Sequence, residues 1–340
     1  MNLKELSQHL GLSKTTVSRA LNGFSDVNEE TRNRVMEAAR RFNYAPNANA
    51  QRLATGRTGA LGIMFPIAEN PFADPLFAEF VAGVADGAVQ CRRDLFVSSA
   101  FDGEEAAYRR LARSKAVDVM ILGALEVEDL RIRLLSHLGL QVVAFGRTAS
   151  SIPYAYLDID NESGCRRATK LLIGLGHRDI ALINGDTRFT AAEHRHVGWL
   201  SAFTKDGLTV PEHLVVTGAA TEEAAYRGAR RLLAAERRPT AFVCASMYLA
   251  SGCVRAIRDC GLAVGADISV VAHDDGMAVI RPEAFEPSLT ATAASVRGAG
   301  LRVAEMAAAL ADGGEIADLQ EVRPVELIFR DSAQPPRRSL

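Results

Sequence analysis

The chain has 340 residues, of which 48% are hydrophobic and 24% charged, which excludes a disordered protein and predicts two or three packed units. No stretch reaches the roughly 18 apolar residues of a membrane span, and residues 1–10 lack the apolar run of an export signal, so we expect a cytoplasmic protein. Five cysteines without C-x-x-C spacing favour free thiols, and we expect no metal and no cofactor.

Charge is distributed unevenly along the chain. The net charge is −2, yet residues 1–57 hold nine Lys and Arg against five Asp and Glu, a local balance of +4. A basic N-terminal module on an acidic remainder predicts a polyanionic partner for this end of the protein.

Two short helices joined by a tight turn are predicted at the start of the chain. Leucines recur at helical spacing over residues 3–10, and Gly11 then marks the end of a first helix. Ser13 supplies an N-cap, so we expect a second helix from Lys14 to about Asn22.

The second helix has two different faces. Val17, Ala20 and Leu21 form an apolar stripe, whereas hydroxyl and basic side chains project on the other side. Such a face suits a DNA groove, because Ser, Thr and Lys bind phosphates and Arg binds guanine through two hydrogen bonds.

A third helix is predicted from Glu29 to about Phe42, with Asn28 or Asp26 as its N-cap. Its apolar positions complete a small core, although a solvated helical bundle without a ligand would share this pattern. Residues 48–54 then have the length of one or two helical turns, too short to be stable alone.

From residue 59 onward, apolar runs of strand length alternate with segments of helical length, such as 73–90, 104–114 and 161–176. Apolar strands separated by helices indicate parallel sheets covered on both faces, and seven or more strands are better divided between two sheets. We expect the division near Leu157. The runs are GALGIMF, DLFVSSA, VDVMILG, VVAF, IALING, AFVCAS and ISVVA.

Polar and aromatic residues follow several of these runs, where an open parallel sheet collects its ligands. Carboxylates, amides and arginines bind vicinal hydroxyls, and aromatic rings stack on sugars, so the set predicts a polyol site. There are plainer alternatives: Asp160 and Asn161 as helix caps, Trp199 as core, and Arg147 as the partner of a surface acid. The candidates are Asn70, Phe72, Asp74, Phe77, Arg147, Asp160, Asn161, Arg195 and Trp199.

Several motifs carry a family resemblance. They are L-x-x-L-x-x-x-L-G-L-S-x-T-T-V-S-R-A-L-N, V-N-E-E-T-R and Y-x-P-N-x-x-A-x-x-L near the start, then G-H-R-D-I-A-L-I-N-G, R-x-x-G-W and S-V-V-A-H-D-D in the body. The chain resembles the lactose-repressor/galactose-repressor (LacI/GalR) family. This resemblance implies an all-α helix-turn-helix head, an α/β two-lobed body like a periplasmic binding protein, and a DNA-binding transcriptional repressor.

The resemblance also implies roles for head residues. Lys14, Thr15 and Arg19 would read bases. A hinge helix from about Asn47 to residue 54 would order on operator DNA and insert Leu53 into the minor groove, which suits an apolar side chain on a marginal helix. The residues expected to face phosphates are Thr16, Ser18, Asn22 and Asn28.

In the body, Arg195 and Asp274 match positions that hold effector hydroxyls in the family. The chain departs from the family pattern at Ser246, where many relatives have Asn, and at His273, where an aromatic residue is more common. The tether and the Asn-, Phe- and Asp-containing loop after residue 65 look most similar to regulators of α-glucoside uptake.

These features predict the following organisation. The head spans 1–46, followed by a hinge and linker at 47–58. The first lobe would comprise 59–157 with about 287–317, the second lobe 158–286 with about 318–330, and residues 331–340 a flexible tail. No leucine-heptad segment follows residue 330, so we expect a homodimer on a pseudo-palindromic operator.

The sequence contains no G-x-S-x-G, H-E-x-x-H, Walker or Rossmann motif, which argues against an enzyme. We expect a mono- or disaccharide effector in the cleft between the lobes, and no membrane partner. Effector binding would favour a lobe arrangement in which operator affinity falls. A solute-binding protein without gene regulation, or a regulator of a nucleobase or another non-sugar metabolite, remains the alternative.

Overall fold

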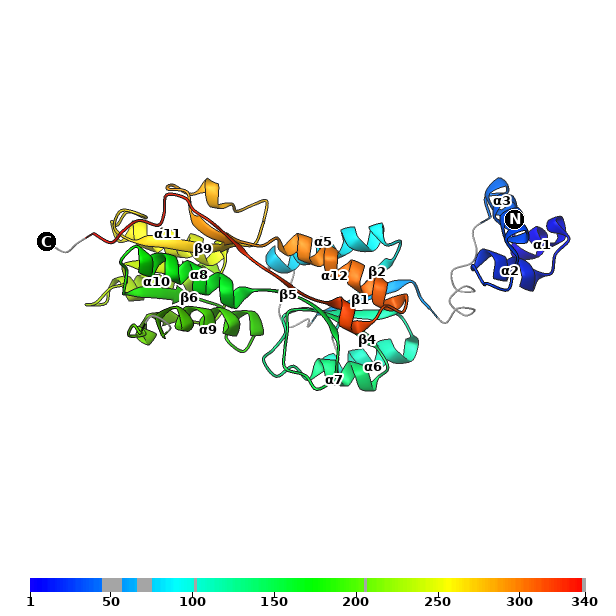
Figure 1. Cartoon of the computed structure of the whole chain (residues 1–340), viewed down its shortest axis with the longest axis horizontal. Helices are drawn as coiled ribbons and strands as arrows, with labels where there is room; N and C mark the ends of the chain where they lie inside the picture. The colour runs from blue at the N-terminus through cyan, green and yellow to red at the C-terminus, as the bar shows by residue number, and fades with distance from the viewer. Residues whose placement is uncertain (45–56, 66–74, 101–102, 205–206, 338–340) are drawn as a thin grey trace. The chain divides into compact units, whose positions relative to one another are not determined.

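The computed structural model describes residues 1–44, 57–65, 75–100, 103–204 and 207–337. The chain divides into two compact units, Met1–Gly59 and Ala60–Leu340, and Figure 1 labels most of their helices and several of their strands. In the described part of the chain, no helix combines the length and apolar character needed to cross a membrane.

The first unit contains the three predicted helices, α1 (Leu3–Leu10), α2 (Lys14–Leu21) and α3 (Glu29–Arg41). Their apolar stripes meet in one small core, in which Leu6, Val17 and Val35 are completely buried. The prediction of an all-α head is therefore confirmed.

Local capping explains where these helices begin and end. Gly11 ends α1 in the left-handed conformation, with φ of 65°. The Ser13 hydroxyl accepts the N–H of Thr16 and caps α2. Asn28, and not Asp26, caps α3 by accepting the N–H of Thr31 at 2.7 Å.

The first lobe of the second unit contains a six-stranded parallel sheet in the order β11-β5-β4-β3-β1-β2. Helices α5 (Pro75–Gln90) and α12 (Val296–Ala311) cover one face, and α6 (Glu104–Ser114) and α7 (Arg131–His137) the other. The strands are β1 (Ala60–Phe65), β2 (Asp94–Ser99), β3 (Val119–Leu122), β4 (Gln141–Phe145), β5 (Ala155–Ile159) and β11 (Gln320–Arg323).

The second lobe contains a six-stranded sheet in the order β12-β10-β9-β8-β6-β7, parallel except for β12. Helices α8 (Asn161–Gly174) and α9 (Thr190–Thr204) cover one face, and α10 (Glu222–Leu233) and α11 (Met247–Asp259) the other. The strands are β6 (Ile180–Ile183), β7 (Val215–Val216), β8 (Ala241–Cys244), β9 (Ser269–Asp274), β10 (Thr290–Ala293) and β12 (Glu326–Ile328). This lobe also has 3-10 turns at Glu212–Leu214 and Pro282–Ala284, whereas the 3-10 turn Ile316–Leu319 packs in the first lobe.

The chain passes between the two sheets after Ile159, Ala293 and Arg323, which differs from the boundaries we expected. Leu157 still pairs within the first sheet. Strand β10 belongs to the second sheet and β11 to the first, the reverse of their expected lobes. Their sequences, TATA and QEVR, lack the apolar run that identifies a buried strand.

Residues 331–337 are docked on the second lobe, so the expectation of a flexible tail is wrong for them. Ser332 is completely buried, and its hydroxyl accepts the N–H of Thr290 at 2.8 Å. The carbonyl oxygen of Gln334 lies 2.8 Å from Nε2 of His177. Hydrogen bonds and not apolar side chains hold this segment on the lobe. Its polar composition is therefore the same as that of a flexible tail, and the sequence did not indicate that it is docked.

A short pairing of backbone groups, here called the interlobe bridge, joins the segment after β3 to the start of α9. The N–H of Thr190 donates to the carbonyl of Leu125 at 2.9 Å, and the N–H of Val127 donates to the carbonyl of Arg188 at 3.0 Å. The Arg188 side chain also lies 3.6 Å from the carboxylate of Glu126. The first residue of α9 is thus hydrogen-bonded to the other lobe.

Candidate DNA-binding face and effector pocket

The first turn of α2 presents exposed side chains. Lys14 and Thr15 are exposed, as a base-reading role requires. The Thr16 hydroxyl lies 2.9 Å from that of Ser13, and both remain near the helix N-terminus, where N–H groups and hydroxyls favour a phosphate.

Arg19, the third predicted base reader, has partners in the free protein. Its Nε lies 2.8 Å from a carboxylate oxygen of Asp26, and its guanidinium lies 4.6 Å from the centre of the Phe24 ring. The side chains of the ion pair are 42% and 54% exposed, so water competes for both groups.

The other predicted phosphate contacts are partly engaged within the head. Nδ2 of Asn22 lies 3.4 Å from the hydroxyl of Ser18, and the side-chain oxygen of Asn28 caps α3. The predicted contacts at Asn47 and Leu53 lie outside the described residues.

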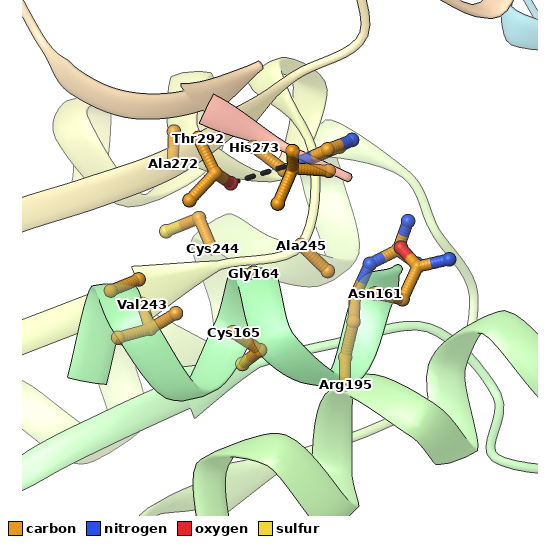
Figure 2. A pocket seen from close by; sticks show the side chains of 12 residues that line it. Asn161, Gly164, Cys165, Arg195, Val243, Cys244, Ala245, Ala272, His273 and Thr292 are labelled. Carbon is orange, nitrogen blue, oxygen red and sulfur yellow. Dashed lines mark hydrogen bonds between the residues drawn. The ribbon is translucent and has the colours of Figure 1, made fainter. Parts of the chain in front are cut away.

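A small pocket lies in the second lobe at the carboxyl ends of β8 and β9 (Figure 2). Its apolar lining contains Val243, Ala245 and Ala272, and Arg195, His273 and Asn161 provide its polar groups. The remaining lining residues are Gly164, Cys165, Ala168, Cys244, Thr292 and Val325.

Arg195 extends from α9 into this pocket. Within the described residues, its guanidinium has no hydrogen bond and no ion pair. Burial lowers the pKa of Arg195 from its ordinary value, and the negative charge of Asp275 opposes that shift. Because a guanidinium remains protonated at neutral pH, the pocket contains a cationic donor that lacks an acceptor.

His273 lies on β9 beside Arg195 and is 8% exposed. Its Nδ1 is 2.9 Å from the hydroxyl of Thr292. Burial and, to a smaller extent, the charge of Arg195 lower the pKa of His273 to about 3. The imidazole is therefore neutral at pH 7, and because Nδ1 is engaged by Thr292, only Nε2 is left for a ligand.

Arg147 does not line this pocket. Its Nε donates to the carboxylate of Asp158 on β5 at 2.7 Å, so Arg147 has an acidic partner, but a buried one and not the surface acid of the alternative above. Nδ1 of His194 lies 3.9 Å from the same carboxylate. Burial raises the pKa of Asp158, and Arg147 opposes that rise.

Several other predicted effector residues have structural roles. Trp199 is completely buried in the core beneath α9, so the prediction that its ring stacks on a ligand is wrong. Asp160 caps α8 and Ser246 caps α11. Phe77 packs against the core of the first lobe.

Asp274 lies at the end of β9, where its carboxylate accepts the N–H of Gly276 at 2.9 Å. It is not among the lining residues, and its effector role stays a prediction. The candidates Asn70, Phe72 and Asp74 lie outside the described residues.

Two residues near the pocket were missed as candidates. Asp158 had a detectable signal, since a carboxylate inside the apolar run LDI needs a buried partner. Thr292 had no detectable signal. Its segment, TATA, lacks the apolar pattern of a strand, so the sequence does not show that this segment pairs with β9. In the described residues, no group of three His, Cys, Asp or Glu side chains is placed to hold a metal ion.

Comparisons with known proteins agree with both parts of the fold. Residues 2–47 match the family model for bacterial regulatory proteins of the lacI family, and residues 169–333 match that for a periplasmic binding protein-like domain. The chain belongs to the LacI family of transcriptional regulators, which bind DNA through a helix-turn-helix head.

Among individual proteins, the chain is similar to the HTH-type transcriptional regulator AglR of Rhizobium meliloti (strain 1021), with 43% identity over 100% of this chain and 96% of AglR. The structure of a lac repressor dimer bound to operator and the anti-inducer ONPF is 25% identical, covers 98% of this chain and 99% of its own, and has a TM-score of 0.76. The structure of the regulator CelR in complex with cellobiose is 27% identical, covers 98% of this chain and 99% of its own, and has a TM-score of 0.69.

Proposed function

We propose that this regulator is a repressor that binds operator DNA as a homodimer and is released when a small sugar enters the second-lobe pocket. Lys14, Thr15 and Arg19 read bases in this proposal. The other predicted head residues bind phosphates, and Leu53 enters the minor groove. The likeness to a lac repressor dimer bound to operator supports this arrangement.

The observation that carries the sugar proposal is the unpartnered guanidinium of Arg195 beside the neutral imidazole of His273. Together with Asn161, these groups offer several hydrogen bonds above an apolar lining, which suits a molecule with hydroxyls on an apolar ring. The likeness to CelR, whose structure contains cellobiose, supports the same ligand class.

The proposed coupling runs through α9. This helix carries Arg195 into the pocket and begins at Thr190, which is hydrogen-bonded to the first lobe. A ligand that fixes Arg195 therefore acts on an element that joins the lobes. If the effector lowers operator affinity by a given factor, bound operator must lower effector affinity by the same factor.

Arg195→Ala tests this proposal. We expect the variant to bind operator with wild-type affinity but to lose release by sugars, because the pocket would lack its cationic donor. Fluorescence anisotropy with labelled operator, with and without mono- and disaccharides at saturating concentration, measures both properties. Arg227→Ala, an exposed change on α10, is the control that should keep the response.

A thermal-shift screen of wild type separates the alternatives, because a ligand bound to the folded state raises its melting temperature. Stabilisation by a nucleobase and by no sugar would replace the sugar proposal. Failure to bind any operator would favour a solute-binding protein instead.

A further inference from the structure

Asn161, the first residue of α8, lines the pocket and has an unsatisfied acceptor. It is 6% exposed, and its side-chain NH2 donates to the carbonyl of Ile159 at 3.1 Å. Its side-chain oxygen is buried and has no hydrogen-bond partner. One N–H of the NH2 group is held by Ile159, whereas the oxygen is the acceptor of this amide that lacks a partner.

Arg195 lines the same pocket and has the opposite requirement. Figure 2 shows both side chains at the polar end of the pocket. A guanidinium only donates hydrogen bonds, whereas an amide oxygen only accepts them. The buried oxygen of Asn161 costs free energy while it lacks a partner, and the half-buried guanidinium of Arg195 has donors to spare, so a ligand that satisfies both is favoured over one that satisfies only one.

This pair restricts the chemistry of the ligand. A group placed between them has to accept from Arg195 and donate to Asn161. An alcohol hydroxyl has one donor and two acceptor lone pairs and can do both, whereas an ionised carboxylate or phosphate can only accept. An anionic group in this place would pair with Arg195 but would leave the oxygen of Asn161 without a donor and repel it.

We infer that Asn161 is a specificity-determining residue that selects uncharged, hydroxyl-bearing ligands over anionic sugars. The inference rests on the proposed function, because it assumes that the effector occupies this pocket. It also narrows that proposal, since sugar acids and sugar phosphates are disfavoured even though Arg195 alone would attract them.

Asn184 provides a matched control in the same lobe. It is 2% exposed, its NH2 donates to the carbonyl of Ala192 at 2.8 Å, and its side-chain oxygen is also buried without a partner. It is not among the residues that line the pocket. Asn161→Leu and Asn184→Leu therefore each remove a buried side-chain amide with one hydrogen bond to a backbone carbonyl. Only Asn161→Leu removes an acceptor from a residue that lines the pocket.

The test uses the full-length protein and titration calorimetry with maltose, methyl α-D-glucoside, D-glucuronate, glucose 6-phosphate and hypoxanthine. We expect wild type to bind a neutral glucoside at least about tenfold more tightly than either anion, the loss typical of one unmade hydrogen bond to a buried group. Asn161→Leu should lower the affinity for the neutral glucoside by a similar factor, whereas Asn184→Leu should keep the wild-type affinity. Circular dichroism melts of both variants check that they are folded.

Equal or tighter binding of an anion by wild type would overturn the inference, and this comparison holds even if Asn161→Leu does not fold. Wild-type affinity in a folded Asn161→Leu protein would overturn it as well. If hypoxanthine alone binds and Asn161→Leu abolishes that binding, the sugar proposal fails while the acceptor role of Asn161 stands, because a purine edge also donates and accepts. Binding of no probe by wild type would overturn both.

Discussion

Arg19 is engaged in the free head, but its contacts are weak compared with the one proposed on DNA. An exposed ion pair such as that with Asp26 contributes about 0–1 kcal/mol, and an exposed cation–π contact such as that with Phe24 about 0.5–1 kcal/mol. A bidentate contact to guanine contributes about 1–3 kcal/mol of discrimination. The internal contacts therefore orient Arg19 without preventing it from reaching a base.

His177 connects the docked C-terminal segment to the sheet of the second lobe. It is 1% exposed, with Nδ1 at 2.8 Å from the hydroxyl of Thr240 and Nε2 at 2.8 Å from the carbonyl of Gln334. Burial lowers the pKa of His177, which the hydrogen bond to Gln334 partly offsets.

This lowered pKa predicts an acid-sensitive fold. Below the unfolded-state pKa of about 6.5, the unfolded chain takes up a proton that folded His177 does not, so the free energy of unfolding falls as pH decreases toward the folded-state pKa. The contribution is fully present above about pH 6.5. Urea denaturation of wild type and His177→Gln between pH 7.5 and 5 should give a smaller slope for the variant.

His213→Gln, at an exposed position, is the control and should keep the wild-type slope. Part of the slope will remain in His177→Gln because the pKa of His273 is also lowered. An identical slope in wild type and His177→Gln would show that His177 contributes nothing to acid sensitivity.

At the scale of elements, close helix packing places the pocket side chains. A Cβ at Gly198 on α9 would lie 2.2 Å from the carbonyl oxygen of Glu162 on α8, closer than any real contact. The two helices can approach this closely only because residue 198 has no side chain. Since α8 carries Asn161 and α9 carries Arg195, this contact also sets the spacing of the polar groups in the pocket.

Gly198→Ala should therefore destabilise the protein by about 1–3 kcal/mol, because the backbone of α8 has to move away. We also expect weaker effector binding, measured by calorimetry beside chemical denaturation. Gly174→Ala, in the last turn of α8 with no atom within 4 Å of the added Cβ, should be neutral or stabilise by up to about 1 kcal/mol. Equal stability of the two variants would contradict this account of the helix pair.

At the scale of the whole molecule, the interlobe bridge is the contact whose loss should shift the lobe equilibrium. Thr190→Pro removes the N–H that donates to Leu125, yet proline is tolerated at the first residue of a helix. Residue 189 precedes it in an extended bridge, which also suits a following proline. Thr190→Ala loses the same side chain but keeps the N–H.

We expect Thr190→Pro to increase amide hydrogen exchange at Val127 by about tenfold or more, because the paired backbone opens locally. Effector and operator affinities should then change in opposite directions, since both depend on one lobe equilibrium. Thr190→Ala should leave exchange at Val127 near wild type. A change of both affinities in the same direction would contradict a two-state coupling through the bridge.

The sequence allowed the head and the alternating body to be predicted because their signals are local. Helical spacing and the cap residues Gly11 and Ser13 place the first two helices within a residue of their observed bounds. Apolar runs identify the central strands, since a strand buried on both faces has few polar positions. The polar edge strands β10 and β11 and the docked tail carry no such signal.

The sequence by itself determined the helix-turn-helix head, the two parallel sheets and the family. Only the tertiary structure decided that Trp199 belongs to the core and that Arg147 pairs with Asp158. It also decided that Asn161 and Arg195 share one pocket. The physical reason is the distance along the sequence over which each signal acts. Helical periodicity and capping involve residues a few positions apart, whereas burial and the pairing of polar groups depend on which distant elements pack together.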